Sequence, residues 1–191
     1  MSSDRPPFVV PIGLSANEYY DLGVNYKLCG WIAQSKKALR TAILLDPTGI
    51  GKDACTYLRA YLPRHEVPEQ AVLENNKAVN RSVTDKIGAE KSLLALTIKY
   101  PDFEWPFGNL GHQYIEVGRL EEAKEVLHKA LAINPNYANA LLHLAAIYMQ
   151  ENNHQEADRY LLEVLKIDPR YKSNILENYP ALKDRLHSLA S

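Results

Sequence analysis

The chain has 191 residues, of which 46% are hydrophobic and 24% charged, a balance typical of a folded globular protein. Its 22 basic and 23 acidic residues give a net charge of −1, which provides no electrostatic basis for binding nucleic acid or an anionic membrane surface. No stretch reaches the roughly 18 consecutive apolar residues of a membrane-spanning helix, and the first residues do not resemble a secretion signal. We therefore expect a cytoplasmic protein with no direct membrane insertion.

The first 14 residues contain Pro6, Pro7 and Pro11 around a short apolar strip. Proline fixes its own backbone angle φ and removes a hydrogen-bond donor, so residues 1–14 are predicted to form an extended N-terminal arm. We expect this arm to lie over the first pair of helices. The alternative, that the strip occupies a groove in this molecule or in a neighbouring one, stays open.

Residues 16–48 are predicted to form a first pair of helices, with Ser15 as the N-cap. Four residues of the first helix recur at i, i+3, i+4 and i+7, which places them on one helical face. They are Tyr19, Leu22, Gly23 and Tyr26. Pro47 ends the second helix, because proline is not compatible with a helix interior.

An inserted helix is predicted at about residues 53–62, where Ala54, Tyr57, Leu58 and Tyr61 have the same spacing and Pro63 follows. The preceding Gly-Ile-Gly-Lys run is not a phosphate-binding loop, because that motif requires Ser or Thr after the lysine and Asp53 stands there. We interpret the run as a helix C-cap followed by a turn.

Residues 70–102 predict a second, degenerate helix pair. Its second helix is clear, because Ala89, Leu93 and Leu96 precede Pro101 at the expected spacing. The register of its first helix is uncertain. In strict register polar residues fall on the buried face, whereas a shift of one residue would bury Val72 and Val79.

The clearest pattern occurs in residues 104–137 and again in residues 138–171. The first copy contains Phe107, Leu110, Gly111, Tyr114, Ala123, Leu127, Ala130 and Pro135. The second contains Leu141, Leu144, Ala145, Tyr148, Ala157, Leu161, Val164 and Pro169, so the two prolines are 34 residues apart. This order of large, small and aromatic residues resembles the tetratricopeptide repeat, a helix–turn–helix unit.

The resemblance implies an all-α fold, a right-handed superhelical solenoid of antiparallel helix pairs. Residues 15–191 would then form a single domain, because one helix pair cannot bury its apolar face without a neighbour. Residues 171–179 and about 180–190 are predicted as closing helices. The last is expected to cap the array, with a homodimer seam as the alternative.

Stacking the pairs would place one face of each first helix on a concave inner surface, opposite the buried face. This face is rich in asparagine, histidine and aromatic residues, which suit contact with a peptide backbone and with apolar side chains. The predicted partner-binding residues are Tyr20, Asn75, Trp105, Asn109, His112, Asn139 and His143.

Some tetratricopeptide domains hold chaperone C-termini with a clamp of lysine, asparagine and arginine, and this sequence lacks it. Tyr20 and Val24 stand at the first lysine and asparagine positions, and Trp105 and Asn109 stand at the last pair. The six histidines and two cysteines show no metal-binding spacing, and no catalytic constellation is visible. We therefore expect neither a metal or other cofactor nor an enzymatic activity.

The predicted function is protein–protein interaction, as an adaptor, scaffold or assembly factor that binds a peptide or helix of a partner in the concave groove. Two alternatives stay open. The chain could form homo-oligomers through its cap or arm, or it could be an accessory subunit that docks through the inserted helix and the convex face. No nucleic-acid partner is expected.

Overall fold

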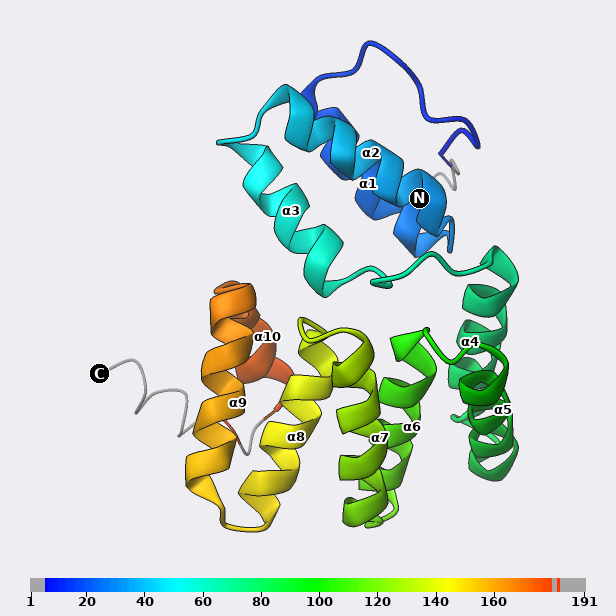
Figure 1. Ribbon diagram of the computed structural model, residues 1–191, viewed down its shortest axis with the longest axis vertical. Helices are drawn as coiled ribbons and strands as arrows, with labels where there is room; N and C mark the ends of the chain where they lie inside the picture. The colour runs from blue at the N-terminus through cyan, green and yellow to red at the C-terminus, as the bar shows by residue number, and fades with distance from the viewer. Residues whose placement is uncertain (1–5, 180–181, 183–191) are drawn as a thin grey trace. The chain divides into compact units, whose positions relative to one another are not determined.

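The computed structural model describes residues 6–179 and Leu182, and these residues contain ten α-helices and no strand (Figure 1). The helices are α1 (Ala16–Leu28), α2 (Ile32–Leu45), α3 (Ile50–Ala60), α4 (Glu69–Arg81), α5 (Lys86–Lys99), α6 (Glu104–Glu116), α7 (Leu120–Ile133), α8 (Ala138–Gln150), α9 (His154–Ile167) and α10 (Tyr171–Asn178). The predicted all-α fold is confirmed. The predicted capping helix at 180–190 lies outside the described residues except for Leu182.

The chain forms two compact units, which divide between Leu73 and Glu74, inside α4. Unit 1 contains the arm and α1 to α3, and unit 2 contains α5 to α10. A single domain over residues 15–191 stays a prediction.

In unit 1, α1 pairs with α2, and α3 packs against both. Residues 6–14 of the arm lie over this pair, because the hydroxyl of Tyr26 donates to the Pro7 carbonyl at 2.6 Å and that of Tyr19 donates to the Pro11 carbonyl at 2.9 Å. The ring of Phe8 meets Trp31 edge-on, with ring centroids 5.4 Å apart. Two tyrosines of the repeat pattern therefore hold the arm.

Side chains define where the helices of unit 1 begin. Ser15 caps α1 as predicted: its hydroxyl accepts from the Glu18 N–H, and the Glu18 carboxylate accepts from the Ser15 N–H at 2.8 Å. The inserted helix begins earlier than the predicted residue 53. Asp46 accepts hydrogen bonds from the N–H groups of Gly49 and Ile50, at 2.8 and 3.1 Å, and so starts α3 at Ile50.

Unit 2 contains two regular pairs, α6 with α7 and α8 with α9. The turns inside these pairs share one geometry, because Gly118 and Asn152 occupy equivalent positions and both have a left-handed backbone, with φ of 76° and 59°. In each turn the next N–H bonds back to the helix, from Arg119 to the Tyr114 carbonyl and from Asn153 to the Tyr148 carbonyl. The 34-residue period is therefore visible in the backbone.

The core of unit 2 consists of fully buried leucines on the predicted faces, at Leu110, Leu127, Leu141, Leu144 and Leu161. Gly111 is needed for close helix approach, because a Cβ at this position would lie 2.6 Å from the Leu127 side chain. The degenerate α4 differs from the shifted register at one end. Val72 is buried, but Val79 is 37% exposed and Ala78 is buried in its place, while Asn75 is buried between Val72 and Ala78.

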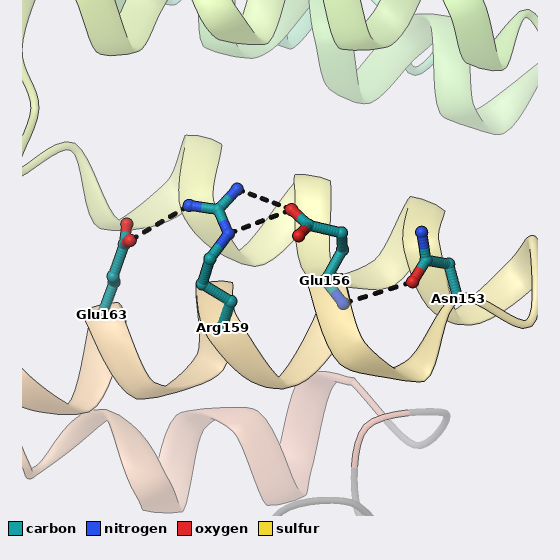
Figure 2. Close-up of polar contacts among 4 residues, drawn as sticks. All are labelled: Asn153, Glu156, Arg159 and Glu163. Atoms are coloured by element: carbon teal, nitrogen blue, oxygen red, sulfur yellow. Dashed lines mark hydrogen bonds and ion pairs between the residues drawn. The ribbon is translucent and has the colours of Figure 1, made fainter.

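Polar side chains order the ends of the repeats. Asn134 donates to a Glu104 carboxylate oxygen at 2.7 Å and accepts from the Asn136 N–H. On α9, Asn153 accepts from the Glu156 N–H at the helix start, as Figure 2 shows. None of the described helices is long and apolar enough to cross a membrane.

Candidate binding face

An asparagine pair links the first helices of two neighbouring repeats in unit 2. Asn109 of α6 donates its side-chain amide to the Asn75 oxygen of α4 at 2.9 Å. Asn75 is only 2% exposed, whereas Asn109 is half-buried. The two residues are 34 positions apart, so they are equivalent in strict repeat register. The remaining donors and acceptors of Asn109 are available at the surface.

A histidine pair makes the corresponding link between α6 and α8. The rings of His112 and His143 lie with centroids 5.1 Å apart, and His143 also approaches the Tyr179 ring, which follows α10, at 6.1 Å. His112 is exposed and His143 is half-buried. These two histidines occupy non-equivalent positions in their repeats, so their contact depends on how α6 and α8 pack.

A third link joins α8 to α10, where the Tyr171 hydroxyl donates to the Asn139 side-chain oxygen at 3.3 Å. Beside it, Tyr137 is buried against Gly108, and a Cβ at Gly108 would come within 2.4 Å of the Tyr137 ring. Gly108 therefore provides the space that the Tyr137 ring fills between the repeats.

These contacts define one surface along α4, α6, α8 and α10, which we call the inner face. It consists of Asn75, Asn109, His112, Asn139, His143, Tyr171 and Tyr179. Burial, together with the neighbouring His112, lowers the pKa of His143 to about 3, and burial raises the pKa of Tyr179. Because the set contains no Asp, Glu, Lys or Arg, it presents amide, imidazole and phenol groups rather than fixed charges.

Five of the seven predicted binding residues belong to the inner face, and the other two do not. Trp105 is half-buried and packs against Phe103 at a centroid distance of 5.5 Å. Tyr20 belongs to unit 1, where its ring lies edge-on to Tyr57 of α3 at 6.1 Å. That the seven residues bind a partner stays a prediction.

The sequence reasoning missed Tyr171 and Tyr179. Tyr171 had a usable signal, because it lies 34 residues after the buried Tyr137. Tyr179 had none, since it follows a short closing helix that matches no repeat position.

The inner face offers hydrogen-bond donors and acceptors beside flat aromatic surfaces. This combination suits a peptide backbone or neutral polar side chains. Among the described residues, no group of three or more His, Cys, Asp or Glu could hold a metal ion.

Comparison with known proteins agrees with this architecture. Tetratricopeptide repeat models match residues 19–48 and 114–176. The chain is 27% identical over 179 residues to the type IV pilus assembly protein PilF of Pseudomonas aeruginosa, covering 83% of this chain and 70% of that protein.

Solved structures with similar folds include the TPR2AB-domain:pHSP90 complex of yeast Sti1, with a TM-score of 0.50 and 14% identity, covering 91% of this chain and 67% of that one. The structure of Pseudomonas aeruginosa PilF has a TM-score of 0.44 and 21% identity, covering 86% of this chain and 92% of that one.

Paired helices with a 34-residue period and small residues at the close contacts define a helical repeat protein. The family matches make the class specific: the chain is a tetratricopeptide repeat protein, as the sequence pattern predicts. Proteins of this kind are typically interaction modules without enzymatic activity.

Proposed function

We propose that this protein is an assembly factor or adaptor that holds an extended segment of a partner protein against the inner face. The segment would be bound through its backbone and its neutral side chains, because the inner face carries amides, imidazoles and phenols.

The observation that carries this proposal is the chain of contacts across four alternate helices, α4, α6, α8 and α10. Asn75 bonds to Asn109, His112 meets His143, and Asn139 bonds to Tyr171. These contacts already hold the side chains in place, so ordering them costs little free energy when a ligand binds. Three of the residues, Asn109, His112 and Asn139, keep exposed or half-exposed polar groups that a peptide could reach.

The likeness to PilF supports an assembly role. That relative is named as a type IV pilus assembly protein, and the similarity extends over 83% of this chain. An assembly factor must hold a partner reversibly, and a face of neutral hydrogen-bonding groups provides contacts of that strength.

The proposal is tested by affinity capture with the full chain beside a His112→Ala, Asn139→Ala double variant. Both side chains are exposed, so the variant should keep its helical content by circular dichroism. We expect quantitative mass spectrometry to show a partner that the wild type retains and the variant loses at least fivefold.

The matched control is a His154→Ala, Gln155→Ala variant, which removes one imidazole and one amide from exposed positions of α9. This control should retain the partner at the wild-type level. If the inner-face variant retains the partner equally well, the proposal is wrong. Loss of the partner on replacing Tyr57 of α3 and Tyr61, which follows α3, would favour docking through the inserted helix.

A further inference from the structure

We propose that a second site, on unit 1, binds a short acidic segment of a partner protein that carries an apolar side chain next to its carboxylates. The site is a cavity of about 420 Å³ between one face of α2 and the loop that follows α3. We call it the α2 cavity. Its walls comprise one face of α2, from Ile32 to Leu44, together with Glu66 and Val67 of the loop.

Three cations and one carboxylate line the α2 cavity. Lys36 and Lys37 lie on one turn of α2 and Arg40 lies on the next, and Glu66 lines the cavity from the loop. Lys36 is 7% exposed, and its ammonium group donates to the His65 carbonyl at 2.9 Å, which ties the loop to the helix. The cavity wall is therefore built around a buried cation and has an excess of positive charge.

The charges of Lys37 and Arg40 on α2 differ from that of Arg159 on α9. On α9, Arg159 bonds to Glu156 at 2.7 Å and to Glu163 at 3.2 Å, so its charge is matched within the helix (Figure 2). By contrast, neither Lys37 nor Arg40 forms an ion pair with any carboxylate in the part of the chain that the structure describes. A carboxylate from a ligand would supply the missing partner.

The apolar part of the wall restricts the ligand further. Ile32 and Val67 line the cavity, and Leu44 at its end is 82% exposed. Covering Leu44 with an apolar side chain would be favourable, because apolar surface would leave water. A purely anionic ligand would leave this surface exposed, so the chemistry favours a peptide that alternates acidic and apolar residues.

The test uses the full chain and a fluorescein-labelled peptide of alternating leucine and glutamate, with binding followed by fluorescence anisotropy. Two variants disable the two halves of the site: Lys37→Glu with Arg40→Glu, and Leu44→Ser. All three positions are exposed, so helical content should be unchanged. We expect each variant to weaken peptide binding at least tenfold.

Each variant has a matched control. Leu45→Ser changes the neighbouring leucine, which is 56% exposed and does not line the cavity. Lys52→Glu with Lys166→Glu reverses two exposed lysines elsewhere and makes the same change in net charge. Both controls should bind the peptide within twofold of the wild type.

Three results would overturn the proposal. The first is that the wild-type chain does not bind the leucine–glutamate peptide. The second is that the controls and the cavity variants bind this peptide equally well. The third is that the wild type binds a serine–glutamate peptide as tightly as the leucine–glutamate peptide. The last would show that the cations attract any anionic peptide without a contribution from the apolar wall. The inner face is not involved, so none of these results bears on the proposed function.

Discussion

His143 is the residue whose chemistry the fold changes most clearly. Its ring lies between His112 and Tyr179, and burial lowers its pKa from 6.5 to about 3. The imidazole therefore stays neutral in the folded protein at pH 7. The sequence predicted that His143 belongs to the binding surface. It did not predict the lowered pKa, because the pKa depends on the neighbours of the ring, and a single histidine in a repeat pattern does not reveal its neighbours.

This shift predicts a loss of stability in acid. Between about pH 6.5 and pH 3 the unfolded chain binds a proton at His143 that the folded chain does not, so the free energy of unfolding falls as the pH falls. From pH 7 to pH 5 the loss should be at most about 2 kcal/mol. Urea unfolding at both pH values should show this loss in the wild type and a smaller one in His143→Gln.

A His154→Gln variant provides the control, because His154 is exposed at the start of α9. Its pH dependence should match that of the wild type. Identical pH dependence in all three proteins would mean that His143 is protonated as easily in the folded chain as in the unfolded one.

At the scale of the helices, turn chemistry explains which boundaries the sequence predicted. Ser15 gives a strong local signal, and the structure places the start of α1 directly after it. The start of α3 was missed because Asp46, which accepts from the Gly49 and Ile50 N–H groups, lies on the far side of Pro47. The sequence left the register of α4 open, because Asn75 is buried with a bond to Asn109, whereas a hydrophobicity pattern places asparagine outside.

The turn between the third and fourth repeats should depend on Asn134. This residue is 2% exposed and bonds to both Glu104 and the Asn136 N–H. Asn134→Ala would remove a donor from the buried Glu104 carboxylate, at an expected cost of about 2–3 kcal/mol in the free energy of unfolding. Chemical denaturation measures this directly.

The comparison variant is Asn153→Ala, which removes an exposed N-cap from α9 and should cost about 1 kcal/mol. Equal losses for Asn134→Ala and Asn153→Ala would show that the Glu104 contact contributes no more than an ordinary cap does.

At the scale of the whole molecule, the chain divides into two compact units, each with its own buried core. In unit 1 the core contains Tyr26, Leu39 and Leu62, and in unit 2 it contains the leucines of α6 to α9. Repeat proteins gain stability mainly from neighbouring elements, so a unit with a complete core should fold alone.

We therefore expect residues 69–191, which begin with α4, to fold without the rest of the chain. Circular dichroism should show a helical fragment with a cooperative thermal transition. Leu127→Ala should lower its free energy of unfolding by about 2–5 kcal/mol, because Leu127 is fully buried. A fragment that melts without cooperativity, or that tolerates Leu127→Ala, would show that its core requires unit 1.

The sequence by itself determined the tetratricopeptide class, the helix pairs of residues 104–170 and the polar composition of the predicted binding surface. It could do so because prolines, N-caps and small residues act locally and recur with a fixed period. Only the tertiary structure decided that Asn75 meets Asn109, that His112 meets His143 and that the cations of α2 line a cavity. These features arise from packing between helices and loops far apart in the chain, and the sequence pattern of a single helix does not encode which side chains its neighbours will present.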